Sequence, residues 1–121
     1  MSFLNKQTPR WINMLPNEEE RSALTLLAQS SQGPFEKPRE MNFTLYDIKK
    51  GRELEEIVDR VAKAGWRTSI QPQADVPRRL TLTATQDEYV ITEAVYTRDT
   101  SFFRRIARLY KIGYDGWFAS Q

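Results

Sequence analysis

Two kinds of hydrophobic spacing follow one another in this chain, and they restrict its fold more than any other feature. Residues 41–48 (MNFTLYDI) alternate apolar and polar side chains, as a strand with one buried face does. Residues 52–64 (RELEEIVDRVAKA) repeat apolar side chains at helical spacing, and Gly65 is well placed to end that helix. The chain therefore predicts a strand followed by an amphipathic helix. The apolar positions are Met41, Phe43 and Leu45 in the strand and Leu54, Ile57, Val58 and Val61 in the helix.

Two further strands are expected after this helix. Residues 66–71 (WRTSIQ) are rich in strand-forming side chains, and residues 79–85 (RLTLTAT) alternate cleanly. The loop PQADVP separates them. In the second of these strands, Leu80, Leu82 and Ala84 are expected to face inward and Thr81, Thr83 and Thr85 outward.

The C-terminal part predicts a second helix and a closing strand. Residues 86–98 read as an extended stretch that runs into a loop, and Asp99 or Thr100 is expected to cap a helix over residues 100–112. Gly113 is expected to end this helix before YDGWF forms a last strand. The resulting order is β-α-β-β-α-β, which predicts an α+β fold of the ferredoxin-like sandwich type. Both helices would cover one sheet face, and the other would show Asn42, Thr44, Thr81, Thr83 and Thr85.

Residues 1–36 are expected to be an N-terminal helical extension with one helix, placed before a domain spanning residues 37–121. Asn17 is a suitable N-cap, and Glu20 stands where its side chain can reach back to the cap. The helix after it has an apolar stripe, with Leu26 off the stripe. The stripe consists of Leu24, Leu27 and Ala28. Some of the earlier apolar residues are expected to lie on the main domain, from among Phe3, Leu4, Trp11, Ile12 and Met14.

The composition excludes several classes of function. The 121 residues include no cysteine and no histidine, so disulfides, thiolate nucleophiles, Cys/His zinc sites and histidine bases are all ruled out. No Gly-rich phosphate loop is present, and no apolar run approaches the length of a membrane helix. A soluble cytoplasmic protein that uses no cofactor or metal and is not an enzyme is expected. Residues 1–60 carry nine Lys/Arg and ten Asp/Glu, and residues 61–121 carry nine and six, a mild asymmetry well short of the basic stripe of a dedicated nucleic-acid binder.

The chain resembles the RraB-type regulators of ribonuclease activity. The resemblance is carried by the block MNFTLYDIKKGRELEEIVDRVAKAGWRTSI, by AGW at the end of its helix, and by LYKIGYDGW, where a helix runs directly into Tyr-Asp-Gly-Trp. It spans residues 39–121, aligns only loosely over 86–98, and has no evident counterpart for residues 1–36. It implies a ferredoxin-like α/β sandwich and a non-enzymatic role, since the namesake of the family is a protein inhibitor that binds the scaffold region of ribonuclease E. The namesake of the family is strongly acidic, whereas this chain carries a net charge of +2.

Basic side chains supply the candidate partner-binding residues. On a helical wheel, four lie on one arc of the last helix, opposite Phe102, Phe103, Ile106, Leu109 and Tyr110. This arc is either a docking patch for an acidic protein or phosphate backbone, or an ordinary solvated face. A further pair at the start of a strand either protects a sheet edge or joins the same patch. The candidates are Arg104, Arg105, Arg108 and Lys111 in the helix, and Arg78 and Arg79 at the strand.

The motif Tyr114-Asp115-Gly116-Trp117 is interpreted as a structural closure. Asp115-Gly116 would redirect the chain sharply, and the two aromatic rings would cover the two sides of the junction.

Several functions remain open at this point. The leading hypothesis is a cytoplasmic protein that regulates a protein partner, possible partners including a ribonuclease. The alternatives are a toxin-neutralising immunity or antitoxin-like protein and a nucleic-acid-binding module that uses the basic last helix. RNA binding on the sheet would need exposed aromatic residues, and only Tyr46 is a candidate there. An enzyme is the least supported reading.

Overall fold

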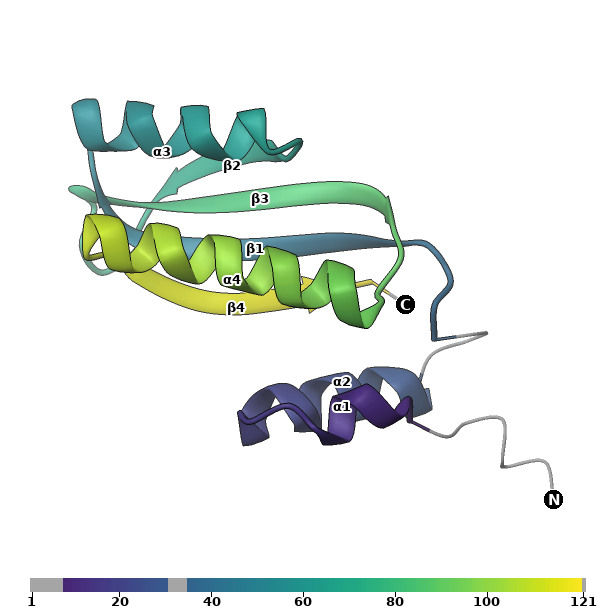
Figure 1. Ribbon diagram of the computed structural model, residues 1–121. Helices are drawn as coiled ribbons and strands as arrows, with labels where there is room; N and C mark the ends of the chain where they lie inside the picture. The colour runs from purple at the N-terminus through teal and green to yellow at the C-terminus, as the bar shows by residue number, and fades with distance from the viewer. Residues whose placement is uncertain (1–7, 31–34, 121) are drawn as a thin grey trace, which may run out of the picture.

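The computed structural model describes residues 8–30 and 35–120. Figure 1 shows the elements in chain order from purple to yellow. They are α1 (Arg10–Asn13), α2 (Glu18–Ser30), β1 (Arg39–Lys49), α3 (Arg52–Lys63), β2 (Arg67–Pro72), β3 (Arg79–Tyr89), α4 (Glu93–Tyr110) and β4 (Gly113–Ala119).

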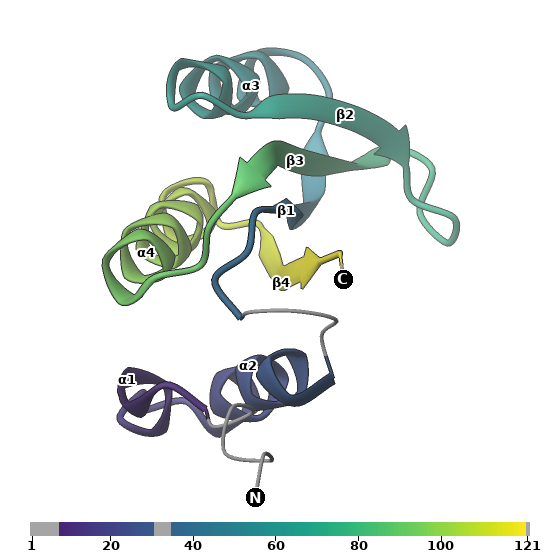
Figure 2. The same ribbon diagram turned by 90° about the vertical axis from the view of Figure 1, so that its right-hand side faces the viewer.

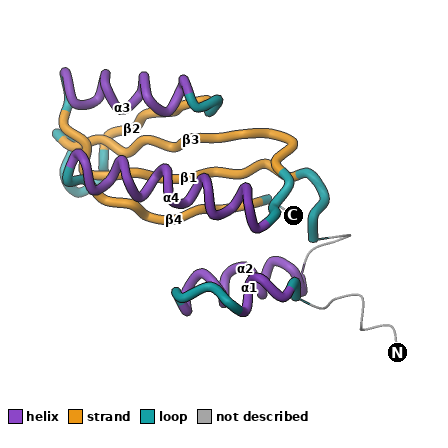
Figure 3. Tube along the Cα trace, in the orientation of Figure 1, coloured by secondary structure: helices purple, strands orange, loops and turns teal. Residues whose placement is uncertain are grey.

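The strands in these described ranges form one antiparallel sheet in the order β2-β3-β1-β4. Helices α3 and α4 lie on the same side of the sheet, and α1 and α2 lie next to one another beyond β4 (Figure 2). The same layers are visible in Figure 3, where helices are purple and strands orange. The predicted α+β class and the β-α-β-β-α-β order from β1 onward are confirmed.

The core lies between the sheet and these two helices. Phe43 of β1 is fully buried, and its ring stacks on Phe103 of α4 at 4.5 Å between centroids. Trp66, which precedes β2, meets the Phe43 ring edge-on at 5.3 Å. Ile57 and Val61 of α3 are fully buried, as their spacing predicted. Because large apolar side chains are each worth about 1.5–3 kcal/mol when buried, this cluster is a major source of stability.

The open sheet face is polar over β1 and β3, as predicted, whereas Phe118 of β4, opposite Asn42, is exposed on the same face. Asn42 and Thr85 lie directly opposite each other on β1 and β3, and the Thr85 hydroxyl donates a 2.6 Å hydrogen bond to Asn42 Oδ1. The remaining polar side chains of this face are half-buried. They are Thr44, Thr81 and Thr83.

Three β-bulges interrupt the strand alternation, each adding a residue to one strand. They lie between Leu45 and Ile48 in β1, between Gln86 and Tyr89 in β3, and between Tyr114 and Trp117 in β4. Each contains a backbone position with positive φ, namely Asp47 at 68°, Glu88 at 54° and Gly116 at 88°. Residues three apart therefore face the same side of the sheet, and Ile48 and Tyr89 are buried in the core.

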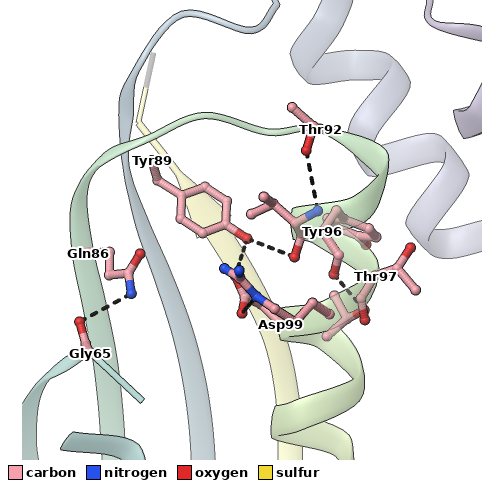
Figure 4. A network of polar contacts seen from close by, with 10 residues as sticks. Gly65, Gln86, Tyr89, Thr92, Tyr96, Thr97 and Asp99 are labelled. Atoms are coloured by element: carbon pink, nitrogen blue, oxygen red, sulfur yellow. Dashed lines mark hydrogen bonds and ion pairs between the residues drawn. The ribbon is translucent and has the colours of Figure 1, made fainter. Parts of the chain in front are cut away.

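The start of α4 differs from the sequence prediction. The helix begins at Glu93, and the Thr92 hydroxyl caps it by accepting a hydrogen bond from the Val95 N–H at 3.2 Å (Figure 4). The expected caps, Asp99 and Thr100, are buried inside the helix instead. Because these two polar side chains interrupt the apolar spacing, the sequence pattern does not predict the first turns of the helix.

The buried polar groups of α4 are satisfied within the fold. The Tyr89 hydroxyl at the end of β3 donates to Asp99 Oδ2 at 2.7 Å, and Arg98 pairs with the same carboxylate at 3.0 Å (Figure 4). The Thr100 hydroxyl donates to the Tyr96 carbonyl oxygen at 2.9 Å. Burial, reinforced by Asp99, raises the pKa of Tyr89 well above its ordinary value. Hydrogen bonding to Asp99 raises the pKa of Arg98. The contacts fix the first turns of α4 against β3.

The N-terminal segment contains two helices, α1 and α2, where one was expected. Asn17 caps α2 as predicted, with Oδ1 accepting the Glu20 N–H at 3.0 Å. The stripe of α2 is also as predicted, with its three members buried and Leu26 65% exposed. Ile12 is buried and the Trp11 ring lies 5.8 Å from that of Tyr96, so α1 packs on the main domain. Met14 is exposed, and Phe3 and Leu4 fall outside the described residues.

Candidate partner-binding site

The six predicted contact residues do not form one patch. Arg105, Arg108 and Lys111 are exposed along α4 and its C-cap. Arg78 is exposed in the connection between β2 and β3, and Arg79 is half-buried where β3 begins. Figure 2 shows this connection projecting to the side of the sheet away from α4. A single surface that includes both groups is therefore not present.

Arg104 stands apart from the other basic residues of α4. It forms an ion pair with Glu20 of α2, and its guanidinium carbon lies 5.4 Å from the centre of the Tyr114 ring. Its side chain is 37% exposed and that of Glu20 is 13% exposed. The expected division of α4 into a basic and an aromatic side is thus wrong at two positions, because Arg104 turns toward α2 and β4 while Leu109 is 57% exposed. The longer helix is rotated so that Tyr96, Thr100, Phe103 and Ala107 are buried.

The structure brings Arg104 and Arg108 together. They line a hollow of about 310 Å³ between the end of α4 and β4, along with Ala107, Ile112 and Tyr114. An apolar hollow bordered by two guanidinium groups suits a partner side chain that combines an acidic group with an apolar stem.

The motif Tyr114-Asp115-Gly116-Trp117 lies within β4, where the expected turn is replaced by a bulge. Tyr114 is paired with Leu45, and Trp117 is paired with Phe43. Both aromatic rings consequently face the helices, since the bulge adds one residue between them. Gly113, just before the motif, is covered by Tyr46, whose ring would lie 2.2 Å from any Cβ at this position.

A chain of polar contacts joins this motif to α4 and α2. The Trp117 indole N–H donates to the Tyr96 hydroxyl at 3.0 Å, and that hydroxyl donates to Glu20 Oε2 at 3.1 Å. The same carboxylate oxygen accepts from Arg104. Burial, followed by the charge of Glu20, raises the pKa of Tyr96 above its ordinary value. The N-terminal helix α2 is therefore fastened to α4 and β4 at one place.

The Tyr114 hydroxyl is the unsatisfied group of this junction. It is buried, and it has no hydrogen-bond partner among the described residues. Burial raises the pKa of Tyr114 to about 12, although the nearby Arg104 opposes the rise.

A cleft of about 480 Å³ opens between α2 and β4 beside this junction. Its walls come from the first turns of α2, from α4 and from the whole of the aromatic motif. The lining residues are Asn17, Glu19, Glu20, Ala23, Arg104, Tyr114, Asp115, Gly116 and Trp117. The motif thus borders a surface cleft as well as packing on the fold.

Residues 17–118 match the family model described as regulator of ribonuclease activity B. The chain belongs to this family. The match covers most of the chain and begins at the cap of α2. Residues from Asn17 onward therefore have a family counterpart, which corrects the expectation of none for residues 1–36. No curated protein and no solved structure matches the chain.

The RraB match includes every wall of the cleft. The sequence pattern indicates Arg104 and the aromatic motif but not Glu19 or Tyr96, and it predicts only a capping role for Glu20. The acidic first turn of α2 was a visible signal, but nothing local pointed to its contacts in α4 and β4. Among the described residues of this RraB family member, no helix is long and apolar enough to cross a membrane.

Proposed function

We propose that this chain is a non-enzymatic regulatory protein that binds a ribonuclease of the ribonuclease E type and lowers its activity in the cytoplasm. The observation that carries the proposal is membership of the regulator of ribonuclease activity B family over residues 17–118. Regulation then follows from occupying a surface of the enzyme, and the ribonuclease keeps all of the catalytic chemistry.

We propose a ferredoxin-like sandwich for residues 37–121, with residues 1–36 as an extension folded onto it. The β2-β3-β1-β4 order and the two helices on one side support this classification. The Trp11 and Ile12 contacts and the Glu20–Arg104 ion pair support an extension that is fastened to the domain.

The proposed contact surface follows the outer side of α4. Arg105, Arg108 and Lys111 are exposed there, and Arg108 borders the hollow that it shares with Arg104. Exposed guanidinium groups attract carboxylates of a partner and set the rate and specificity of association. Arg78 and Arg79 are proposed as a separate, minor contact, because they lie away from α4.

Calorimetry with purified ribonuclease E and a fluorogenic RNA-cleavage assay test the proposal together. We expect binding and a lower cleavage rate, and we expect both to weaken in the Arg105→Glu/Arg108→Glu variant. Arg52→Glu/Lys63→Glu is the matched charge control, because these two side chains of α3 are 91% and 76% exposed. If the wild-type chain neither binds the enzyme nor changes its rate, the proposed function is wrong.

A labelled RNA oligomer separates protein binding from direct nucleic-acid binding. Contacts between basic side chains and phosphates release counterions, so such binding would be strongest at about 50 mM salt and would fall steeply above it. The proposal predicts no appreciable RNA binding at that salt concentration. Tight, salt-sensitive RNA binding that is lost in Arg105→Glu/Arg108→Glu would instead assign the basic face to nucleic acid.

A further inference from the structure

The cleft between α2 and β4 has a charge opposite to that of the basic face of α4. Three carboxylates line it, from Glu19, Glu20 and Asp115, and Arg104 is its one basic side chain. Glu20 is engaged by Arg104 and by the Tyr96 hydroxyl. Glu19 and Asp115 are exposed at the surface, and neither has an ion-pair partner among the described residues. The cleft therefore keeps two unneutralised carboxylates.

The inner wall of this cleft is aromatic. Tyr114 and Trp117 are both half-buried, and they face the helix side of β4. The buried Tyr114 hydroxyl adds a polar atom without a partner in the described part of the chain. Carboxylates beside aromatic faces are the surroundings in which proteins hold organic cations.

The chain already holds one guanidinium group at this place. Arg104 lies over the Tyr114 ring and pairs with Glu20, so a carboxylate and an aromatic face act on it together. No group of three or more acidic side chains in residues 8–30 and 35–120 is arranged to hold a metal ion. The way Arg104 is held indicates a site suited to a side-chain cation, which can reach the carboxylates and the rings at once.

We propose that this cleft receives an arginine or lysine side chain from the protein partner, with Glu19 and Asp115 pairing with the cation and Trp117 packing on its stem. The inference rests on the proposed function, since it names the chemistry of the partner at a second contact. General attraction does not explain such binding, because the chain as a whole carries a net charge of +2.

The probe is a fluorescein-labelled peptide of repeating arginine, glycine and serine, compared with peptides that carry lysine or glutamate in place of arginine. Fluorescence anisotropy gives the affinity, and two-dimensional NMR of the tryptophan indole N–H groups gives the location. The arginine and lysine peptides are expected to bind and to shift the Trp117 indole signal, which is assigned from its absence in Trp117→Phe. The buried Trp66 signal is expected to stay in place.

The Glu19→Gln/Asp115→Asn variant is expected to bind the arginine peptide roughly tenfold more weakly, because two rim ion pairs are lost. The control is Glu18→Gln/Glu55→Gln, which makes the same change in charge. Glu18 is in the same turn of α2 but lines a different hollow, and Glu55 is exposed on α3. Equal weakening in both variants, or an unshifted Trp117 signal, would overturn the proposal.

Binding to ribonuclease E separates this inference from the proposed function. If Glu19→Gln/Asp115→Asn still binds the enzyme with wild-type affinity, the cleft is not the partner contact and the regulatory function stands. If the wild-type chain captures the arginine peptide at Trp117 but does not bind ribonuclease E, the cleft chemistry stands and the proposed partner is wrong.

Discussion

The two sides of the helical layer are attached to the rest of the protein by different chemistry. Beneath α3, the contact is apolar, with Ile57 and Val61 fully buried and the α3 ion pairs confined to its exposed face. Where α4 meets α2 and β4, hydrogen bonds link four polar groups one after another. These are the Trp117 indole, the Tyr96 hydroxyl, the Glu20 carboxylate and the Arg104 guanidinium. Apolar attraction is non-directional, whereas each hydrogen bond requires its donor and acceptor to be aligned. The second contact therefore fixes relative position more tightly.

Truncating a side chain of the apolar core should cause the largest loss in the free energy of unfolding. Phe43→Ala is expected to lower the free energy of unfolding by roughly 3–5 kcal/mol, because a fully buried ring is removed from between Phe103 and Trp66. Urea denaturation followed by tryptophan fluorescence measures it. Leu26→Ala is the control, with an expected change within about 0.5 kcal/mol at this exposed position. A loss for Phe43→Ala no larger than that of the control would contradict the packing.

Removing the Tyr96 hydroxyl should weaken the hydrogen-bonded contact between α2, α4 and β4. Tyr96→Phe is expected to cost about 1–3 kcal/mol, because the Trp117 N–H and the Glu20 carboxylate each lose a partner while the ring remains. A double-mutant cycle with Glu20→Gln measures the coupling between the two groups. Additive losses in that cycle would mean that Tyr96 and Glu20 act independently and that the chain of contacts is not cooperative.

The same substitution at Tyr114 of β4 should change stability with the opposite sign. Tyr114→Phe is expected to stabilise the protein by about 1 kcal/mol, because the buried hydroxyl has no partner in the described residues. Thermal and urea denaturation beside Tyr96→Phe provide the matched pair. If Tyr114→Phe is destabilising, the hydroxyl is hydrogen-bonded in solution and the contrast between the two tyrosines does not hold.

Alkaline pH should produce the smallest effect. Burial raises the pKa of Tyr114 from 10.0 to about 12, so above pH 10.0 the unfolded chain loses this proton while the folded chain keeps it. Stability is therefore unaffected well below pH 10.0 and falls as the pH rises toward about 12. As the pH rises from about 8 to about 10, the titration of Tyr114 should lower the free energy of unfolding by a few tenths of a kcal/mol. Urea titrations at both pH values should show a smaller decline in Tyr114→Phe, and equal declines would contradict this source.

Sequence patterns predicted the apolar side of the molecule well. The strand at 41–48, the helix at 52–64 and the stripe of α2 all follow from periodicity, because each buries one continuous apolar face. The start of α4 was missed because Asp99 and Thr100 are polar yet buried, and their partners lie in other turns and strands.

The candidate site was predicted only in part. Arg105 and Arg108 are exposed as their helical spacing indicated, but Arg104 was placed wrongly because its partner Glu20 lies far away in sequence. The cleft itself was not predictable by local rules. It arises where α2 meets β4, and nothing in either segment alone specifies that contact.

The bulge in β4 determines which of two neighbouring aromatic rings faces the helices, and the bulge contains Gly116 at positive φ. Trp117 faces the helices, and Phe118, opposite Asn42, is 69% exposed on the other side of the sheet. A β-branched residue disfavours the positive φ of 88° at this position, so Gly116→Val would remove the bulge while keeping the number of residues, and regular alternation would shift the end of the strand by one position. The phenyl ring would then take the inner place without an N–H for Tyr96, and the indole would move to the solvent side. A single substitution at this point would thus exchange the chemistry of two faces while leaving every other residue unchanged.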